Sequence, residues 1–320
     1  MAISWASVQP NGTDPVAQWV WGPTDAAIAQ AWAAHLSILI TFANVPPWAS
    51  QPGTNAECVG AVKPGSTPNP PANNQHFLNF TLEVAKRYGS FVRAWELWNE
   101  PDRCNYFRGT AQQYQDLILI PGWFGITLSG APSMIVAPGI SAPHGNIKAT
   151  LDRYLTHKVG SQRFLTVPLE AFTFHRYDRV ADVKHTMDTA ETYERCTQDG
   201  ACVRRYWLTE FGYDNSPQRC HICSWGNPTQ GPGNAAVNIF QYCGRTASNC
   251  FKAFYYNLIN LVDPAFRICA TGTSTCSCDT ALLNANNVCA PNGNGLQPSP
   301  TAGQPRARFT TISQYLLAHP

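Results

Sequence analysis

The stretch Trp95-Glu-Leu-Trp-Asn-Glu-Pro101 decides the fold, and Leu208-Thr-Glu-Phe-Gly-Tyr213 repeats its pattern further along the chain. Each stretch reads as an apolar strand that ends on a glutamate and then breaks into a turn. In barrels and open sheets of parallel strands, the carboxyl ends of the strands form the edge that carries reactive side chains. The sequence therefore predicts that two carboxylates, Glu100 and Glu210, stand at such an edge.

Apolar runs and amphipathic segments alternate along most of the chain. The runs expected to form strands are Ile3–Val8, Ser37–Phe42, Val92–Trp98, Met134–Ala137, Glu170–Phe174, Tyr206–Thr209 and Ala253–Leu258. The expected helices are Asp25–His35, His76–Tyr88, Ala111–Leu119, Asn146–Thr156, Val183–Arg195, Ala235–Tyr242 and Arg308–Ala318. This alternation predicts an α/β fold with a parallel sheet and outer helices. Seven strands in 320 residues favour a (β/α)8 TIM-type barrel over a doubly wound sheet.

Long loops follow several of the predicted strands. Pro46–Asn74, Asn215–Gly233 and Val262–Pro305 are rich in Pro, Gly and Asn. Loops longer than about 15 residues are usually functional or disordered, so we expect these loops to shape a binding cleft. No linker divides the sequence convincingly, and residues 1–320 are interpreted as a single (β/α)-barrel domain.

Composition excludes several classes of protein. Charged residues make up only 13 % of the chain, against roughly 25 % in soluble proteins, and the net charge is +2. The sequence contains no basic run, so it does not indicate a nucleic-acid partner. No apolar run is long enough to span a membrane, and strand-like sequence follows Met1 almost at once. We therefore expect the processed form of an exported, extracellular protein.

The 12 cysteines also indicate an oxidising compartment, because an even, high count favours disulfides. Cys58 and Cys104 each follow a predicted strand end, so a bridge between neighbouring loops is plausible. The alternative is zinc, since Cys220-His-Ile-Cys223 has a metal-like spacing and Cys276-Ser-Cys278 follows it. No second pair has a firm zinc-ribbon spacing, so disulfides are preferred, with their connectivity left open.

The two glutamate motifs resemble those of known enzymes. Trp-Asn-Glu-Pro after a fourth strand and Thr-Glu-Phe-Gly after a seventh resemble the retaining glycoside hydrolases of clan A, with family 39 and its relatives most similar. The stretches Ile3–Pro10, Ile38–Trp48 and Phe174–Tyr177 are similar to the second, third and sixth strands of that family. In those families a first strand, carrying an arginine near the nucleophile, precedes the second. The resemblance thus implies seven recognisable strands here, or another segment in place of the first.

The resemblance also implies a mechanism and the residues that perform it. Glu100 would be the general acid/base and Glu210 the nucleophile of a double displacement on a β-linked oligo- or polysaccharide, with xylan-type or glucan-type chains the leading candidates. Such chemistry needs no cofactor and no metal. By resemblance Asn99 would hold the sugar 2-hydroxyl, His175 and Tyr177 would lie near the nucleophile, and Tyr255 would replace an eighth-strand tryptophan. Aromatic rings pack well on sugar faces, which makes Trp48, Trp98 and Trp225 further substrate-binding candidates.

Other interpretations stay open for several of these residues. A single glutamate before proline could be a helix cap or a salt-bridge partner, and Glu96 is interpreted as an inward-facing structural carboxylate. Trp32 and Trp95 are expected in the core. The chain could also be a catalytically impaired carbohydrate-binding relative of the same fold. A structural, disulfide-rich surface protein would leave the paired glutamate motifs unexplained, and the sequence does not indicate an oligomeric state.

Overall fold

The computed structural model describes residues 1–12, 19–56, 68–141, 146–177, 180–211, 232–244 and 250–255, with only the backbone at 232–236, 251 and 254–255. The chain divides into two compact units. Unit 1 comprises Met1–Phe174 and Thr192–Tyr206, and unit 2 comprises His175–Glu191 and Trp207–Pro320. The division passes through two strands, β7 (Phe172–Arg176) and β10 (Tyr206–Phe211).

Unit 1 is built on a parallel sheet. Its strands lie in the order β1 (Ala2–Ser4), β2 (Ile38–Ala43), β3 (Val92–Glu96) and β4 (Met134–Val136), and all neighbouring pairs are parallel. Beyond the strand ends, a parallel bridge joins Asn99 to Gly139, and another joins Ile140 to Phe174 of β7. The parallel order therefore continues from β4 towards the strand that carries His175.

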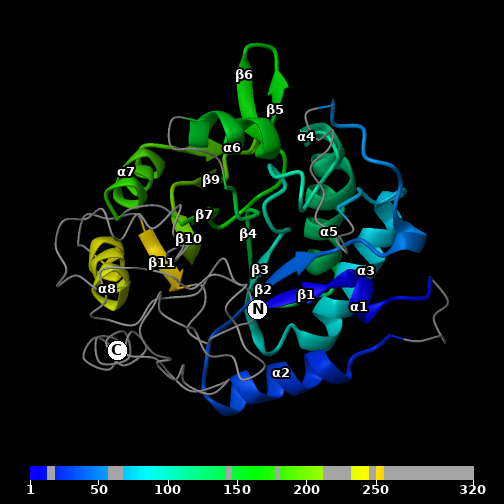
Figure 1. Cartoon of the computed structure of the whole chain (residues 1–320). Coiled ribbons are helices and arrows are strands. Elements are labelled where there is room, and N and C mark those ends of the chain that lie inside the picture. The colour runs from blue at the N-terminus through cyan, green and yellow to red at the C-terminus, as the bar shows by residue number, and fades with distance from the viewer. Residues whose placement is uncertain are drawn as a thin grey trace, which may run out of the picture. The chain divides into compact units, whose positions relative to one another are not determined.

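The connections in unit 1 are mainly helical (Figure 1). They are α1 (Trp5–Val8), α2 (Gly22–Ala33), the 3-10 turn η1 (Pro47–Ala49), α3 (Asn74–Tyr88), α4 (Ala111–Tyr114), the π-helical η3 (Gln115–Leu119), α5 (Ile120–Leu128) and α6 (Ile147–Leu155). Side chains cap the starts of α3 and α4, as Ser4 caps α1. The Asn73 side chain accepts from the Gln75 N–H at 2.7 Å, and Thr110 forms a capping box with Gln113.

Helices α3 and α5 lie side by side in Figure 1, and glycines allow their close approach. A Cβ atom on Gly125 would lie 2.2 Å from Thr81 Oγ1 and 2.6 Å from the Leu78 carbonyl oxygen. Neither atom can retreat far, because Thr81 is buried and the other is backbone. The absence of a side chain at Gly125 therefore sets the spacing of this helix pair.

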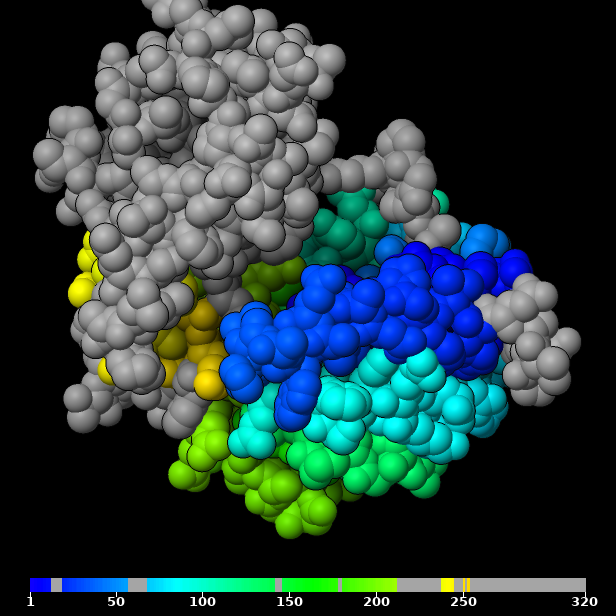
Figure 2. All heavy atoms as spheres, turned by 90° about the horizontal axis from the view of Figure 1, so that it is seen from below, coloured from blue at the N-terminus to red at the C-terminus, as the bar shows by residue number. Residues whose placement is uncertain are grey.

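A column of aromatic rings attaches the segment after α1 to α3. Trp5 stacks on Phe80 at 5.1 Å, Trp19 stacks on the same Phe80 at 5.9 Å, and Trp21 stacks on Trp19 at 4.7 Å between ring centroids. The Arg87 guanidinium lies 5.0 Å above the Trp21 ring. In Figure 2 the blue N-terminal residues and the cyan residues of α3 form one continuous surface, as this packing requires.

Arg87 also joins α3 to α2. It donates to the Asp25 carboxylate through Nε at 2.9 Å and Nη2 at 2.6 Å, and the Tyr88 hydroxyl donates to the same group at 2.7 Å. These hydrogen bonds hold the pKa of Asp25 below its usual value. The ion pair is exposed, so its contribution to stability is small.

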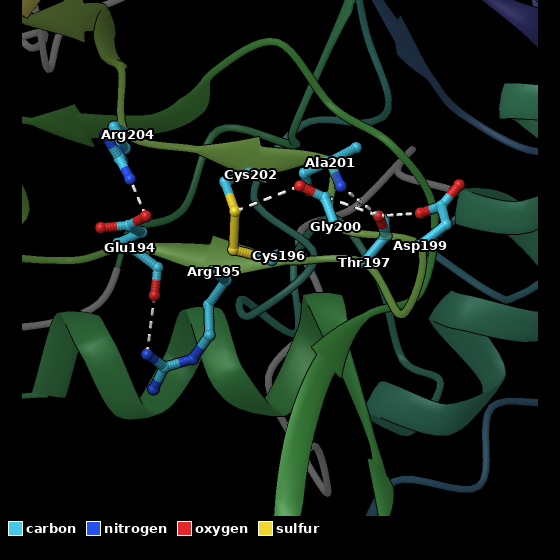
Figure 3. The surroundings of a disulfide bond; sticks show 9 residues. All are labelled: Glu194, Arg195, Cys196, Thr197, Asp199, Gly200, Ala201, Cys202 and Arg204. Carbon is cyan, nitrogen blue, oxygen red and sulfur yellow. Dashed lines mark hydrogen bonds and ion pairs between the residues drawn. A yellow bond between two sulfur atoms is a disulfide. The ribbon is translucent and has the colours of Figure 1, made fainter.

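Two antiparallel hairpins decorate unit 1. One pairs β5 (Thr156–Val159) with β6 (Gln162–Leu165) and projects from the unit in Figure 1. The other pairs β8 (Arg195–Cys196) with β9 (Cys202–Val203), and a disulfide joins Cys196 to Cys202 across it (Figure 3). A nearby Glu194 side chain offers a carboxylate, but both sulfur atoms are already bonded to each other, so the hairpin is closed covalently.

Unit 2 contains the ends of β7 and β10 together with α7 (Val180–Glu191), α8 (Pro232–Cys243) and β11 (Cys250–Tyr255). Its strands lie in the order β11-β10-β7. A disulfide from Cys243 to Cys250 joins the end of α8 to the start of β11. The Tyr242 hydroxyl donates to Asp188 at 2.5 Å, and Lys184 lies 4.9 Å from the Tyr242 ring, so α8 is attached to α7.

The predicted α/β class with parallel strands is confirmed, and each of the seven predicted strands has a counterpart. The prediction for Ile3–Val8 is wrong in its second half. The strand ends at Ser4, whose hydroxyl accepts from the Ser7 N–H at 3.3 Å and caps the helical turn α1. Trp95 is fully buried as expected, whereas Trp32 is 54 % exposed and does not belong to the core.

Closure of a barrel is not observed. Among the described residues, no strand pairing joins β1 to β11. The expected terminal helix Arg308–Ala318 and the two cysteine pairs with metal-like spacing lie outside the described residues. Cys104 is disulfide-bonded, and its expected partner Cys58 also lies outside them. Within the described segments, no helix combines the length and apolarity that crossing a bilayer requires.

Candidate active site

The chain turns sharply where β3 ends. The Trp98 N–H donates to the Glu96 carbonyl at 2.9 Å, which closes a three-residue turn around Leu97. The φ angles of Trp98 and Glu100 are +99° and +42°, in the half of conformational space that residues with a side chain seldom occupy. Such conformations cost about 1–3 kcal/mol each, persist only where their surroundings impose them, and cluster at functional sites.

Hydrogen bonds from neighbouring elements hold this turn in place. The Tyr114 hydroxyl donates to the Leu97 carbonyl at 2.6 Å, and the Glu100 N–H donates to the Gly139 carbonyl at 2.9 Å. Trp98 Nε1 donates to the Tyr106 carbonyl at 3.1 Å. Because α4, the loop after β4 and the loop after β3 all contribute, Glu100 has a defined position before any ligand binds.

Two side chains of this turn are structural. Trp98 is 1 % exposed and makes edge contacts with Phe77 at 5.8 Å and Phe107 at 6.4 Å. A ring enclosed in this way cannot stack on a sugar, so the expected substrate contact of Trp98 is corrected to a packing role. Glu96 is 1 % exposed and accepts a 2.6 Å hydrogen bond from Thr41 Oγ1, which agrees with its interpretation as a structural carboxylate.

Asp102 and Ser141 form a second contact between the loops after β3 and β4. Both carboxylate oxygens of Asp102 accept from the Ser141 N–H at 3.1 Å. Burial and the neighbouring Glu100 charge raise the pKa of Asp102 to about 6, although the hydrogen bond from Ser141 acts in the opposite direction. The sequence analysis missed Asp102, yet a second acid two residues after Glu100 was a visible signal.

Trp48 lies beyond the end of β2, in the turn η1. Its ring is half-buried, its Nε1 donates to the Gln9 carbonyl at 2.9 Å, and it meets the Trp5 ring edge-on at 5.9 Å. The His76 ring, in the first turn of α3, lies 5.3 Å away. Trp48 is thus partly accessible and firmly oriented, and Asn99 is likewise only partly buried.

The second glutamate motif lies in unit 2. Glu210 is carried by β10, where its neighbours Thr209 and Phe211 are buried while its own side chain is 27 % exposed. The Tyr177 hydroxyl, just after β7, donates a short hydrogen bond to Glu210 Oε2. His175 Nδ1 lies 3.5 Å from the same oxygen, and the His175 side chain is fully buried. The structure therefore brings three of the predicted site residues together at the ends of adjacent strands.

The side chains of two further predicted substrate-binding residues are not described. Tyr255 is the last residue of β11, and only its backbone is described. Trp225 lies outside the described residues. Their expected contacts with substrate remain predictions.

Comparison with known proteins gives a structural likeness only. No protein-family model matches the sequence, and no curated protein matches it. Among solved structures, XacCel5A is similar with a TM-score of 0.53 and 14 % identity, over 98 % of this chain and 83 % of that protein. A psychrophilic family 10 endo-β-1,4-xylanase matches with a TM-score of 0.49 and 11 % identity, over 80 % of this chain and 78 % of the xylanase.

A family 39 glycoside hydrolase from the gut symbiont Bacteroides cellulosilyticus WH2 matches with a TM-score of 0.46 and 13 % identity. That match covers 80 % of this chain, which spans about half, 49 %, of the other protein's length. The similar structures are glycoside hydrolases with TIM-barrel folds, and the likeness concerns the fold alone. Particular closeness to family 39 stays a prediction.

Proposed function

We propose that this protein is a retaining glycoside hydrolase that cleaves β-linked oligo- or polysaccharides by double displacement. Glu210 is the nucleophile in this proposal, and Glu100 is the general acid/base. The observation that carries the proposal is the setting of Glu210, which receives a hydrogen bond from Tyr177 and lies beside a buried histidine. The fold likeness to XacCel5A is consistent with it.

A nucleophilic carboxylate must keep one oxygen fixed and the other directed at the anomeric carbon. Tyr177 binds Oε2 of Glu210, and His175 Nδ1 lies 3.5 Å from the same atom. Oε1 is then the oxygen that would attack. A phenol that holds a carboxylate also stabilises its ionised form, which is the form that the first displacement consumes.

The general acid must protonate the leaving oxygen and then accept a proton from water. Glu100 is buried to 8 % exposure and held by the turn after β3, so it has little freedom to move. The retaining mechanism requires the two carboxyl groups to stand about 5–5.5 Å apart across the sugar, and the proposal includes that arrangement.

The substrate in this proposal is a neutral glycan. Asn99 would bind the sugar 2-hydroxyl, and Trp48 would provide an apolar face for a sugar ring. Xylan-type and glucan-type chains are the leading candidates, and no cofactor or metal enters the mechanism. The two disulfides of the described segments agree with action in an oxidising, extracellular compartment.

A hydrolysis screen tests the proposal. The protein is incubated with β-glucans, xylans, cellopentaose and 2,4-dinitrophenyl β-cellobioside or β-xylobioside, and products are sized. Proton NMR of the first product should show the β-anomer, and a 2-deoxy-2-fluoro glycoside should label the peptide that contains Glu210. The variants Glu210→Gln and Glu100→Gln should lose turnover and still bind sugar.

The matched control is Glu83→Gln, which alters an exposed glutamate paired only with Lys86 in the described part of α3. It should hydrolyse at the wild-type rate. Binding of glycans without any turnover by the wild-type protein would reject the hydrolase and favour the impaired carbohydrate-binding relative. An α-anomer as first product would reject the retaining mechanism alone.

A further inference from the structure

Two side chains of the loop after β3 bind one residue beyond β4, Ser141. Asp102 accepts the Ser141 N–H through both carboxylate oxygens at 3.1 Å. Arg103 Nε donates to Ser141 Oγ at 3.1 Å, and Arg103 Nη2 donates to the Ser141 carbonyl at 3.2 Å. We call this set of contacts, formed by Asp102, Arg103 and Ser141, the loop clamp.

The loop clamp begins immediately after Glu100. The Arg103 N–H donates to the Glu100 carbonyl at 2.9 Å, and the Glu100 N–H donates to Gly139 at 2.9 Å. The N–H of the strained residue is therefore tied to the segment after β4 that the clamp holds, and its carbonyl is tied to Arg103 of the clamp itself. A residue at φ +42° relaxes unless such contacts oppose it, so the clamp is a direct cause of the Glu100 conformation.

Stability alone does not explain why the clamp contains a carboxylate. A neutral acceptor such as asparagine could receive the Ser141 N–H without placing a second negative charge near Glu100. Among the described residues, the charged groups that act on Asp102 are Glu100, which repels its charge, and Arg103, which attracts it. A costly charge kept beside a residue of the proposed site indicates a role in the chemistry.

We propose that Asp102 is a positioning residue for Glu100, because its contact with Ser141 fixes the strained turn from which Glu100 donates its proton. This inference rests on the proposed hydrolase function. In the first step Glu100 gives that proton to the leaving oxygen as Glu210 forms its bond to the anomeric carbon. The position of the Glu100 carboxyl group decides how well that proton reaches the leaving oxygen.

The test compares two leaving groups. Departure of 2,4-dinitrophenolate needs no protonation, whereas departure of a sugar from cellopentaose or a xylo-oligosaccharide does. For Asp102→Asn we expect kcat/KM to fall about tenfold on the oligosaccharide and to change less than about twofold on the dinitrophenyl glycoside.

A stability measurement supplies a second readout. The raised pKa of Asp102 means that its ionisation disfavours the folded state as pH rises from 3.8 to about 6. The melting temperature of Asp102→Asn minus that of the wild type should therefore increase as the pH rises across that interval. Asp102→Ser, shorter and also neutral, should change the leaving-group ratio in the same direction if the asparagine variant folds poorly.

Glu170→Gln is the matched control. Glu170 also accepts a backbone N–H, from Ile135 at 2.7 Å, and burial also raises its pKa, but it precedes β7 and lies outside the loop clamp. It should leave the leaving-group ratio unchanged. Equal losses by Asp102→Asn on both substrates would overturn the inference, whereas loss of turnover in Glu100→Gln would still support the hydrolase. No turnover by the wild-type protein would overturn both.

Discussion

The bond from Tyr177 to Glu210 gives a sharp test of the proposed nucleophile. The substitution Tyr177→Phe removes only the phenolic oxygen that donates to Glu210 Oε2. A hydrogen bond to a charged group contributes about 1.5–3 kcal/mol. A change of about 1.4 kcal/mol corresponds to a factor of ten in rate. If the whole free energy of this hydrogen bond stabilises the transition state, its removal should lower kcat/KM by about 10- to 150-fold.

The assay is initial-rate hydrolysis of a 2,4-dinitrophenyl β-glycoside, for which formation of the glycosyl-enzyme does not depend on the general acid. Tyr193→Phe is the control, because Tyr193 also donates to a carboxylate, Asp152 at 2.8 Å, but belongs to unit 1. It should lower the unfolding free energy by about 1–3 kcal/mol and leave kcat/KM within about twofold. A folded Tyr177→Phe variant with wild-type kcat/KM would refute the assignment of Tyr177 as the group that orients Glu210.

Three further predictions concern stability. Gly125→Ala should lower the unfolding free energy by up to about 2 kcal/mol, because overpacking costs about 1–3 kcal/mol and the helix-propensity gain is about 1 kcal/mol. Gly22→Ala, with nothing within 4 Å of its Cβ, should not lower it, and equal urea midpoints for the two variants would contradict this. Burial opposes ionisation of Asp152, but hydrogen bonds from Arg195 and Tyr193 outweigh this effect and lower its pKa. The difference in unfolding free energy between wild type and Asp152→Asn, measured by urea unfolding, should therefore be full above pH 3.8 and shrink as the pH falls below it. Replacing Cys196 and Cys202 with serine opens a short loop and should cost about 2 kcal/mol in the same assay, whereas an unchanged midpoint would show that the hairpin does not depend on the disulfide.

Much of the fold could be predicted because parallel strands buried on both faces read as unbroken apolar runs. Ile38–Ala43 and Tyr206–Phe211 both follow this pattern, and the sequence analysis located both. The hairpins β5-β6 and β8-β9 were missed, since two- to four-residue strands with exposed positions carry no comparable pattern. The end of the first strand was also predicted wrongly, because the Ser4 hydroxyl caps a helical turn and the strand ends there.

The candidate site shows a similar division. Glu100, Glu210 and Tyr177 could be proposed as site residues because each lies near the end of a strand, and position relative to a strand can be read from the sequence. The accessibility of an aromatic ring cannot be read from the sequence, because it depends on residues distant in the chain. Trp48 stays partly exposed while Trp98 is enclosed by Phe77 and Phe107, yet both tryptophans follow strands.

The strained turn after β3 connects the fold to the proposed chemistry. Two residues with positive φ cost a few kcal/mol together, and a protein with a net stability of about 5–15 kcal/mol retains such a cost only where it has an effect. Relaxing Glu100 would require breaking its bond to Gly139 and the contacts of Asp102 and Arg103 with Ser141. The contacts between the loops after β3 and β4 therefore hold Glu100 in place. A substrate binding to this half of the site would not have to order it, and its binding energy would remain available for the transition state.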